Sequence, residues 1–232
     1  MRILGVIPVR GGSKGVPHKN IKPLLGKPLL EYTAEVAQKS VLISRLIVST
    51  DDPSISACAQ GLNIEVPFIR PAHLAMDDTP TLAVLQHALS FYADQDQHFD
   101  AICLLQVTSP FRTVDFLNSA LHKFINHDFD SLISVQKTPL EFHPNWAFFP
   151  KNDAVLELAL PQENIISRRQ ELPVAYYRDG SIYITKTDII MNQNSLFGSQ
   201  IGFIEGPPEA AINIDTHADW KRAEQYLKPD TI

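Results

Sequence analysis

Glycines and cationic side chains alternate in a short segment near the N-terminus, residues 10–20. A glycine has no Cβ and lets backbone N–H groups approach an anion closely, while a neighbouring lysine or arginine supplies positive charge. The glycines of this segment are Gly11, Gly12 and Gly15, and its cations are Arg10, Lys14 and Lys19. The combination is suited to holding a small polyanion.

The spacing within this segment excludes two common phosphate loops. A Walker A loop needs Gly-Lys-Ser/Thr after four intervening residues, and a dinucleotide fingerprint needs Gly-x-Gly-x-x-Gly; neither occurs here. The segment follows an apolar run at residues 3–7 and precedes a helical pattern. Ligands of open α/β sheets bind at the carboxyl ends of strands, so this position favours a binding site over a surface loop with solvated lysines.

The charge of the chain is unevenly distributed. The 232 residues include 20 Lys and Arg against 26 Asp and Glu, a net charge of −6, yet residues 1–30 contain six basic residues and no acidic one. The remainder is therefore strongly acidic, which disfavours general binding of nucleic acid, whereas the local cationic segment can still hold one polyanion.

Strand-like and helix-like patterns alternate along most of the chain, the signature of a parallel sheet covered by helices. Strands are predicted at residues 3–7, 45–49, 101–105, 131–135, 181–185 and 201–204, with a short edge segment at 66–69 and a last extended segment at 212–215. Helices are predicted to begin near Pro28, Pro53, Thr79 and Thr113, to cover about 186–191, and to close the chain up to Leu227. The fold class is therefore α/β, with a Rossmann-like, mostly parallel sheet and helices on both faces.

The alternation stops at about Gln136. Residues 137–176 are rich in proline and aromatic residues and lack a helical period, which predicts a small β-rich arm inserted into an α/β domain made of residues 1–136 and 177–232. An exposed aromatic arm most often meets a second subunit, so we expect a homodimer.

Composition places the chain among soluble globular proteins, with 44% hydrophobic and 20% charged residues. Cys58 and Cys103 are far apart in apolar stretches, which predicts buried, reduced thiols and a cytoplasmic location. We expect no secretion signal and no membrane partner, since no apolar run approaches the length of a membrane span.

Residues 8–20 resemble the nucleotide-binding signature of the CMP-sialic acid synthetases, also called acylneuraminate cytidylyltransferases or CMP-nonulosonic acid synthetases. The family pattern is close to Ile-Pro-Ala-Arg-Gly-Gly-Ser-Lys-Gly followed by Lys-Asn, and only Val9 departs from it, in place of Ala. Six later segments are similar to the same family in the same order: 48–52, 70–71, 105–112, 169–173, 179–184 and 212–216. The resemblance covers nearly the whole chain.

The resemblance implies transfer of CMP from CTP to a nine-carbon sugar acid, N-acetylneuraminic or N,N'-diacetyllegionaminic acid, with release of pyrophosphate. It assigns nucleotide binding to Arg10, Gly11, Gly12, Ser13, Lys14, Lys19, Asn20 and Arg70. Arg10 and Lys14 are the expected catalytic residues, because they can stabilise charge on the leaving pyrophosphate. For Arg70 the alternative is a surface arginine lying over Pro71.

The sugar acid must be recognised through its carboxylate and polar substituents. The family segments assign substrate binding to Gln106, Thr108, Ser109, Arg169 and Tyr183. Arg169 is the expected partner of a carboxylate or acyl oxygen. The alternative for Gln106 is a side chain that caps local backbone. Trp146, in the arm, favours a deoxygenated, diacylated sugar such as legionaminic acid.

A divalent cation is expected because phosphate oxygens must be bridged, and Mg²⁺ uses one or two carboxylates with substrate oxygens and water. Asp215 is the predicted ligand. The family pattern there is Asp-Ile-Asp-Thr, but this chain has Asn213 at the first position, which removes one carboxylate. Asp51 and Asp52 are alternatives, although at least one of them is expected to cap a helix.

Three other functions remain open at this stage. The substrate can instead be pseudaminic acid, and a role as a non-catalytic nucleotide-sugar binding protein draws its support from Asn213. Activation of the eight-carbon acid Kdo is disfavoured, since enzymes for that acid lack the Gly-Gly-Ser-Lys-Gly arrangement. No residue stands out as a general base.

Overall fold

The computed structural model describes residues 1–12, 15–161 and 165–228. Within them lies a six-stranded sheet with the strand order β10-β6-β9-β5-β1-β4. Its strands are β1 (Ile3–Pro8), β4 (Arg45–Ser49), β5 (Ala101–Leu104), β6 (Ser131–Lys137), β9 (Tyr176–Lys186) and β10 (Ile201–Glu205). Only β9 runs antiparallel to its neighbours in this sheet, so the predicted mostly parallel α/β fold is confirmed.

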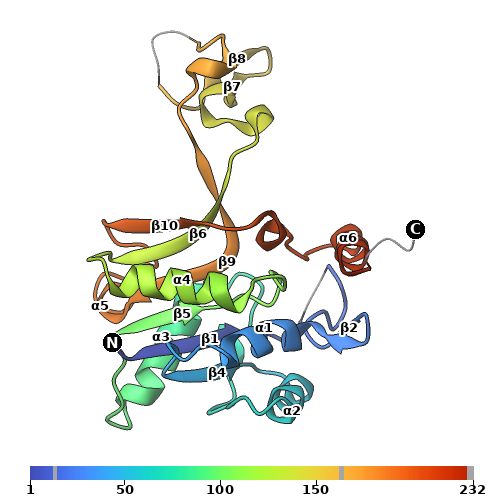
Figure 1. Cartoon of the computed structure of the whole chain (residues 1–232), viewed down its shortest axis with the longest axis vertical. Helices are drawn as coiled ribbons and strands as arrows, with labels where there is room; N and C mark the ends of the chain where they lie inside the picture. The colour runs from blue at the N-terminus through green and yellow to red at the C-terminus, as the bar shows by residue number, and fades with distance from the viewer. Residues whose placement is uncertain (13–14, 162–164, 229–232) are drawn as a thin grey trace.

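Helices cover both faces of the sheet (Figure 1). They are α1 (Leu29–Gln38), α2 (Pro53–Gly61), α3 (Thr81–Ala93), α4 (Val114–Ile125), α5 (Thr187–Met191) and α6 (His217–Leu227). Short 3₁₀ turns occur at η1 (Ala72–Leu74), η2 (Leu140–Phe142), η3 (Pro144–Trp146), η4 (Arg169–Glu171) and η5 (Pro208–Ala211). Within the described residues, no helix has the length and apolar character needed to cross a membrane.

The apolar side chains form two clusters, one on each side of the sheet. One cluster joins the strands to α1, α2, α4 and α6, with Leu29, Leu117 and Trp220 buried in it. The other joins them to α3 and α5 through Leu85 and Ile190. Because both faces are covered, β1 and β5 are continuous apolar runs without polar alternation, which is why the sequence predicted them well.

Three helix starts are fixed by side chains. Asp52 accepts hydrogen bonds from the backbone N–H groups of Ser54 and Ile55 and caps α2. Thr113 caps α4, and Thr216 forms a capping box with the third helical residue at the start of α6. The α2 and α6 starts matter for function, since both follow segments that reach the N-terminal loop.

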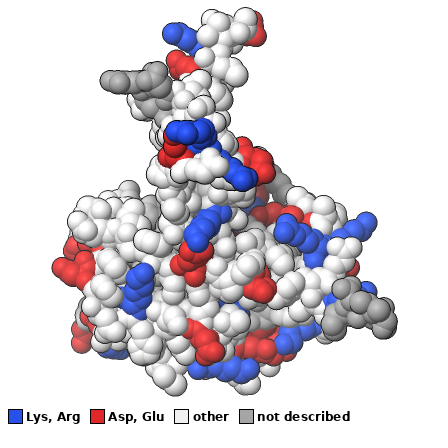
Figure 2. Space-filling view, turned by 45° about the horizontal axis from the view of Figure 1, so that its top comes forward, with Lys and Arg blue, Asp and Glu red and all other residues white. Residues whose placement is uncertain are grey.

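The segment between β6 and β9 leaves the sheet as an arm, shown at the top of Figure 1. The last paired residues of the two strands are Lys137 and Tyr176, and beyond them lies an antiparallel hairpin of β7 (Phe148–Asn152) and β8 (Val155–Leu158). The visible surface of the arm carries both basic and acidic atoms among uncharged ones (Figure 2). The role of this arm in dimerisation stays a prediction.

Two predicted segments differ from the structure. The edge segment at 66–69 is reduced to isolated bridges of Glu65 to Ile47 and of Ile69 to Thr50, because Pro67 interrupts a continuous ladder. The last extended segment, 212–215, has no strand assignment and connects η5 to α6.

A separate two-stranded hairpin of β2 (Pro23–Leu24) and β3 (Lys27–Pro28) precedes α1.

Candidate functional site

Two adjoining pockets open at the carboxyl ends of β1 and β5. The first, which we call the loop pocket, has a volume of about 360 Å³ and is lined by residues of the N-terminal loop together with Arg70, Asp77 and Asp215. The second, the sheet pocket, has a volume of about 330 Å³ and is lined by residues of β5 and β9. Thr81 and Gln106 line both pockets. A ligand in one pocket can therefore meet a ligand in the other.

Close contacts hold the glycine loop in place. The backbone N–H of Gly11 donates to Asp51 Oδ1 over 3.1 Å, and Asn20 Nδ2 donates to the carbonyl of Arg10 over 3.0 Å. A Cβ added at Gly15 would lie 2.1 Å from the carbonyl oxygen of Asp215. A glycine is therefore required where the loop passes this segment.

The remaining loop residues contribute less to the described geometry. An added Cβ at Gly12 would meet nothing within 4 Å, so this glycine faces open space. Two predicted contacts, Ser13 and Lys14, lie outside the described residues.

Both described cations of the loop form ion pairs with carboxylates that also line the loop pocket. Arg10 Nη2 lies 2.6 Å from Asp77 Oδ1. Lys19 Nζ lies 2.9 Å from Asp215 Oδ1 and also donates to the carbonyl of Ile214 over 2.8 Å. The pocket thus holds two ion pairs whose four members all line it.

Arg70 is buried beneath the loop pocket rather than exposed over Pro71. Its guanidinium donates to the hydroxyl of Ser49 and to the carbonyls of Ser49 and Val9. Burial lowers the pKa of Arg70 to about 10, so the side chain stays charged at neutral pH. It presents a fixed positive charge at the floor of the pocket.

The predicted sugar-binding residues divide between the two pockets. Gln106 lines both, Thr108 lines the loop pocket, and Tyr183 lines the sheet pocket, where burial raises the pKa of its phenol. Ser109 is buried, and its hydroxyl has no hydrogen-bond partner among the described residues. At Gly180, which has a φ of +83°, an added Cβ would lie 3.2 Å from Gln106 Oε1 and 3.4 Å from Ser109 Oγ.

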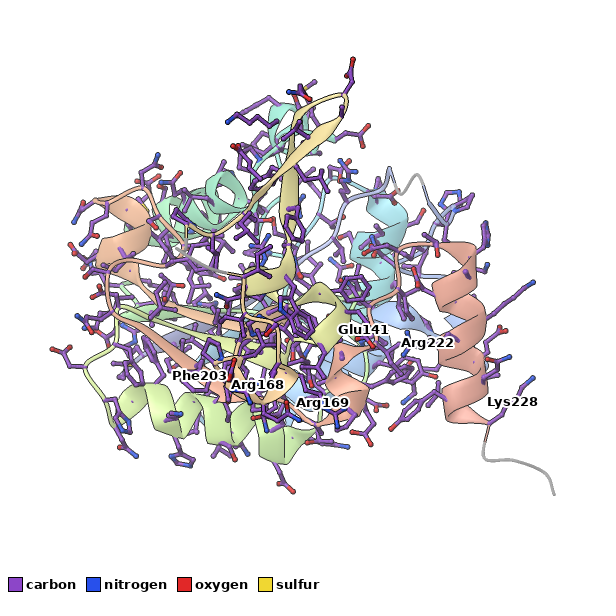
Figure 3. All side chains as sticks on the ribbon, turned by 90° about the horizontal axis from the view of Figure 1, so that it is seen from above. Glu141, Arg168, Arg169, Phe203, Arg222 and Lys228 are labelled. Carbon is purple, nitrogen blue, oxygen red and sulfur yellow. The ribbon has the colours of Figure 1, made fainter. Side chains whose placement is uncertain are left out.

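Arg169 is not brought to either pocket. It lies exposed in η4 on the arm, beside Arg168, and lines neither the loop pocket nor the sheet pocket (Figure 3). The arginine that does line the sheet pocket is Arg178, which sequence reasoning missed as a site residue. The sequence could have indicated Arg178 by its position directly before Asp179-Gly180, where β9 passes from the arm into the α/β domain.

A buried polar network supports the sheet pocket, and its members had no predicted role. Arg112 donates to the carbonyls of Gln106 and Ser181 and to the hydroxyl of Thr33. Burial lowers the pKa of Arg112 to about 10. Asp179, in the wall of the pocket, accepts bonds from the Ser181 N–H and from the hydroxyl of Ser134. The network fixes the backbone that carries Gln106.

Asp215 points into the loop pocket with both oxygens in contact. Lys19 bonds one oxygen, and Asn213 Nδ2 donates to the other over 3.1 Å. Asp52 is committed to capping α2, and Asp51 holds the Gly11 N–H, so each has a structural role. Among the described residues, no group of three or more His, Cys, Asp or Glu side chains is placed to hold a metal.

A family model described as cytidylyltransferase matches residues 4–220. The chain belongs to the cytidylyltransferase family. It is 31% identical to a pseudaminic acid cytidylyltransferase of Campylobacter jejuni and 32% identical to a CMP-N,N'-diacetyllegionaminic acid synthase of Legionella pneumophila, over 98% of this chain and 97% of each relative. It is 30% identical to an N-acylneuraminate cytidylyltransferase of Streptococcus agalactiae, over 95% of this chain and 52% of the relative.

Solved structures support the fold of this cytidylyltransferase. A CMP:2-keto-3-deoxy-manno-octonic acid synthetase complexed with CTP aligns with a TM-score of 0.72 over 98% of both chains, at 18% identity. A 4-diphosphocytidyl-2C-methyl-D-erythritol synthase of Anaerococcus prevotii aligns with a TM-score of 0.69 at 12% identity. At these identities the likeness shows the fold alone. The resemblance seen in the sequence motifs is confirmed by the family match, and the chain is a nucleotidyltransferase.

Proposed function

We propose that this cytidylyltransferase transfers CMP from CTP to a nine-carbon nonulosonic acid and releases pyrophosphate. The observation that carries the proposal is the junction of the two pockets at Thr81 and Gln106. It allows a sugar hydroxyl from the sheet pocket to approach the α-phosphorus of a nucleotide in the loop pocket. In-line attack of this kind depends mainly on positioning and on neutralising charge.

CTP occupies the loop pocket in this proposal. Arg10, Lys19 and Arg70 supply three positive charges around the space, and the Gly15 region brings backbone close to it. Lys14 and Ser13 belong to the same loop and are proposed to contact the triphosphate as well. Arg10 and Lys14 would stabilise the charge that develops on the leaving pyrophosphate.

Asp215 is the proposed protein ligand of Mg²⁺. Its carboxylate is largely exposed to the loop pocket, and carboxylate oxygens are the donors that Mg²⁺ prefers. One carboxylate fits an ion held mainly by substrate phosphates and water. When bound, the ion would supply positive charge that neutralises the phosphates. Lys19 would then transfer from Asp215 to the triphosphate, while Asn213 keeps the carboxylate oriented.

The sugar acid occupies the sheet pocket. Arg178 is the cation placed to meet its carboxylate, and Gln106 and Tyr183 offer polar contacts to its substituents. Thr108 and Ser109 complete the polar side of the junction. Two of the relatives are named for pseudaminic and diacetyllegionaminic acids, so we propose a diacylated acid of this kind as the substrate, ahead of N-acetylneuraminic acid.

The protein is proposed to act as a homodimer in the cytoplasm, where CTP is available. The arm exposes several large apolar side chains, including Phe142, Phe149 and Leu156, which a second copy of the chain would cover. Such a dimer would let Arg169 reach the sheet pocket of the partner subunit. This would explain why Arg169 lies away from both pockets of its own subunit.

The experiment that tests the function measures pyrophosphate release from CTP with a panel of nonulosonic acids. We expect Mg²⁺-dependent release with pseudaminic or N,N'-diacetyllegionaminic acid and slower release with N-acetylneuraminic acid. ATP, GTP and UTP in place of CTP serve as controls. The proposal is wrong if no nonulosonic acid supports release while the eight-carbon acid Kdo does.

A further inference from the structure

One ion pair of the loop pocket has no role in the proposed reaction. The pair of Lys19 with Asp215 joins a nucleotide-binding cation to the proposed metal ligand. The pair of Arg10 with Asp77 instead joins the other described cation to a carboxylate that neither the family motifs nor the metal site explains. Asp77 is therefore the unexplained charge in this pocket.

Asp77 belongs to the segment between η1 and α3, which forms one wall of the loop pocket. Met76 and Thr79 of the same segment, and Leu74 at the end of η1, also line the pocket. The side chains of Arg10 and Asp77 remain 30% and 45% exposed, so water reaches both partners. An ion pair exposed to this extent is weak and is readily exchanged for a stronger partner.

A triphosphate is such a partner. Its oxygens bring more negative charge than one carboxylate, and they can accept two parallel bonds from a guanidinium. If Arg10 stayed paired with Asp77 while it bound the triphosphate, the carboxylate of Asp77 would lie beside the negative phosphates and repel them. The arrival of nucleotide must therefore separate Arg10 from Asp77.

We propose that Asp77 is a positioning residue of the reaction, which holds Arg10 at the wall of the empty loop pocket and recovers it as pyrophosphate leaves. The inference rests on the proposed binding of CTP in this pocket. Asp77 thus lowers the affinity for phosphate-bearing ligands and speeds the release of the pyrophosphate product. It does not affect a ligand without phosphates.

The test compares Asp77→Asn with Asp78→Asn by calorimetric binding. Asp78 is exposed on the same segment but does not line the pocket. Asp78→Asn makes the same change in net charge as Asp77→Asn and therefore serves as the control. We expect Asp77→Asn to tighten CTP and pyrophosphate binding roughly two- to fivefold, the scale of one exposed ion pair, with cytidine binding unchanged. Asp78→Asn should change none of these, and Asp77→Glu should restore wild-type values.

A second readout is product inhibition, in which pyrophosphate should inhibit Asp77→Asn at lower concentration than wild type. Weaker CTP binding in Asp77→Asn would overturn the inference, because Asp77 would then be preparing Arg10 for the nucleotide. Equal effects of the two Asn substitutions would also overturn it, since the cause would be general charge. If wild-type protein binds pyrophosphate but not CTP, the proposed function is wrong. The exchange of Arg10 between Asp77 and phosphate is then decided by pyrophosphate binding alone.

Discussion

The α/β domain, which we call the body, and the arm differ in how far their side chains are buried and paired. In the body, β1 is buried on both faces, and the buried Arg112 donates to the carbonyls of Ser181 and Gln106. In the arm, β7 is exposed along its whole length, and Phe149 and Leu156 are 60% and 64% exposed. The body buries its core side chains within the chain, whereas the arm leaves large apolar side chains exposed.

The difference is consistent with the proposal that the body carries the nucleotide site and the arm carries the contact between subunits. Every described cation of the loop pocket is fixed by contacts inside the body, so nucleotide binding does not need the arm. Arg169, in contrast, is carried by the arm and has no pocket in its own subunit. Substitutions in the two regions should therefore fail in different ways.

Removal of the Asp215 carboxylate should give the largest effect and should be confined to the body. We expect Asp215→Ala to lower Mg²⁺-dependent turnover about 100-fold or more, because a charge placed at the reacting phosphates is lost. Pyrophosphate release measures the effect, and light scattering should show an unchanged dimer. Asp215→Asn keeps the size of the side chain and serves as the control for charge. Unchanged turnover would move the metal ligand to Asp51.

Loss of Arg112 should damage the stability of the body. Arg112→Met leaves the Gln106 and Ser181 carbonyls and the Asp179 carboxylate without their buried cation. We expect the free energy of unfolding to fall by about 3–5 kcal/mol in urea denaturation. Asp128→Ala, which removes an exposed partner of Lys186, should cost under about 1 kcal/mol. Similar losses in both variants would show that the buried network does not stabilise the body.

Polar substitution of the arm should disrupt assembly and leave the body folded. We expect Phe149→Ser with Leu156→Ser to weaken the dimer roughly 30-fold or more, since both are large apolar side chains of the exposed hairpin. Light scattering over a concentration series measures this. Lys151→Ser with Glu157→Ser changes charged residues of the same hairpin and should leave the dimer intact. A wild-type chain that is monomeric and fully active would contradict the proposed role of the arm.

Arg169 provides the most selective test, because it would link the two regions across a dimer. Arg169→Ala should raise the KM for the sugar acid roughly tenfold and leave the KM for CTP unchanged. A mixed dimer of Arg169→Ala and Asp215→Ala subunits, isolated with two affinity tags, would then have one complete site. It should show about half the wild-type kcat/KM for the sugar acid. Activity no higher than the average of the two single variants would place Arg169 in its own subunit's site.

Most of the fold could be predicted because the body folds from local and periodic signals. The run Arg45–Ser49 is a strand as predicted, and Thr113 begins α4 through the hydrogen bond that its residue type suggests. The arm had no helical or strand period, so its hairpin could be foreseen only as β-rich. The predicted segment 212–215 lacked a partner strand, which a sequence pattern cannot reveal.

The site could be predicted only where one segment carries its own signal. The loop with Arg10 and Lys19 has that signal in its glycines and charges. The pairing of Arg10 with Asp77, in contrast, joins residues far apart in sequence, and nothing in the spacing of either predicts the contact. The entry of Arg178 into the sheet pocket likewise depends on β9 lying between β5 and β6.

The continuity of β9 restricts how this protein can be re-engineered. One strand runs from Tyr176 at the base of the arm through Asp179 and Gly180 to Tyr183 in the sheet pocket, without a break. An arm grafted from a relative would either bring the relative's residues of the pocket wall with it or require a junction in the middle of a paired strand. If the arm forms the proposed dimer and the sheet pocket binds the sugar acid, a chimera would inherit assembly and substrate choice together.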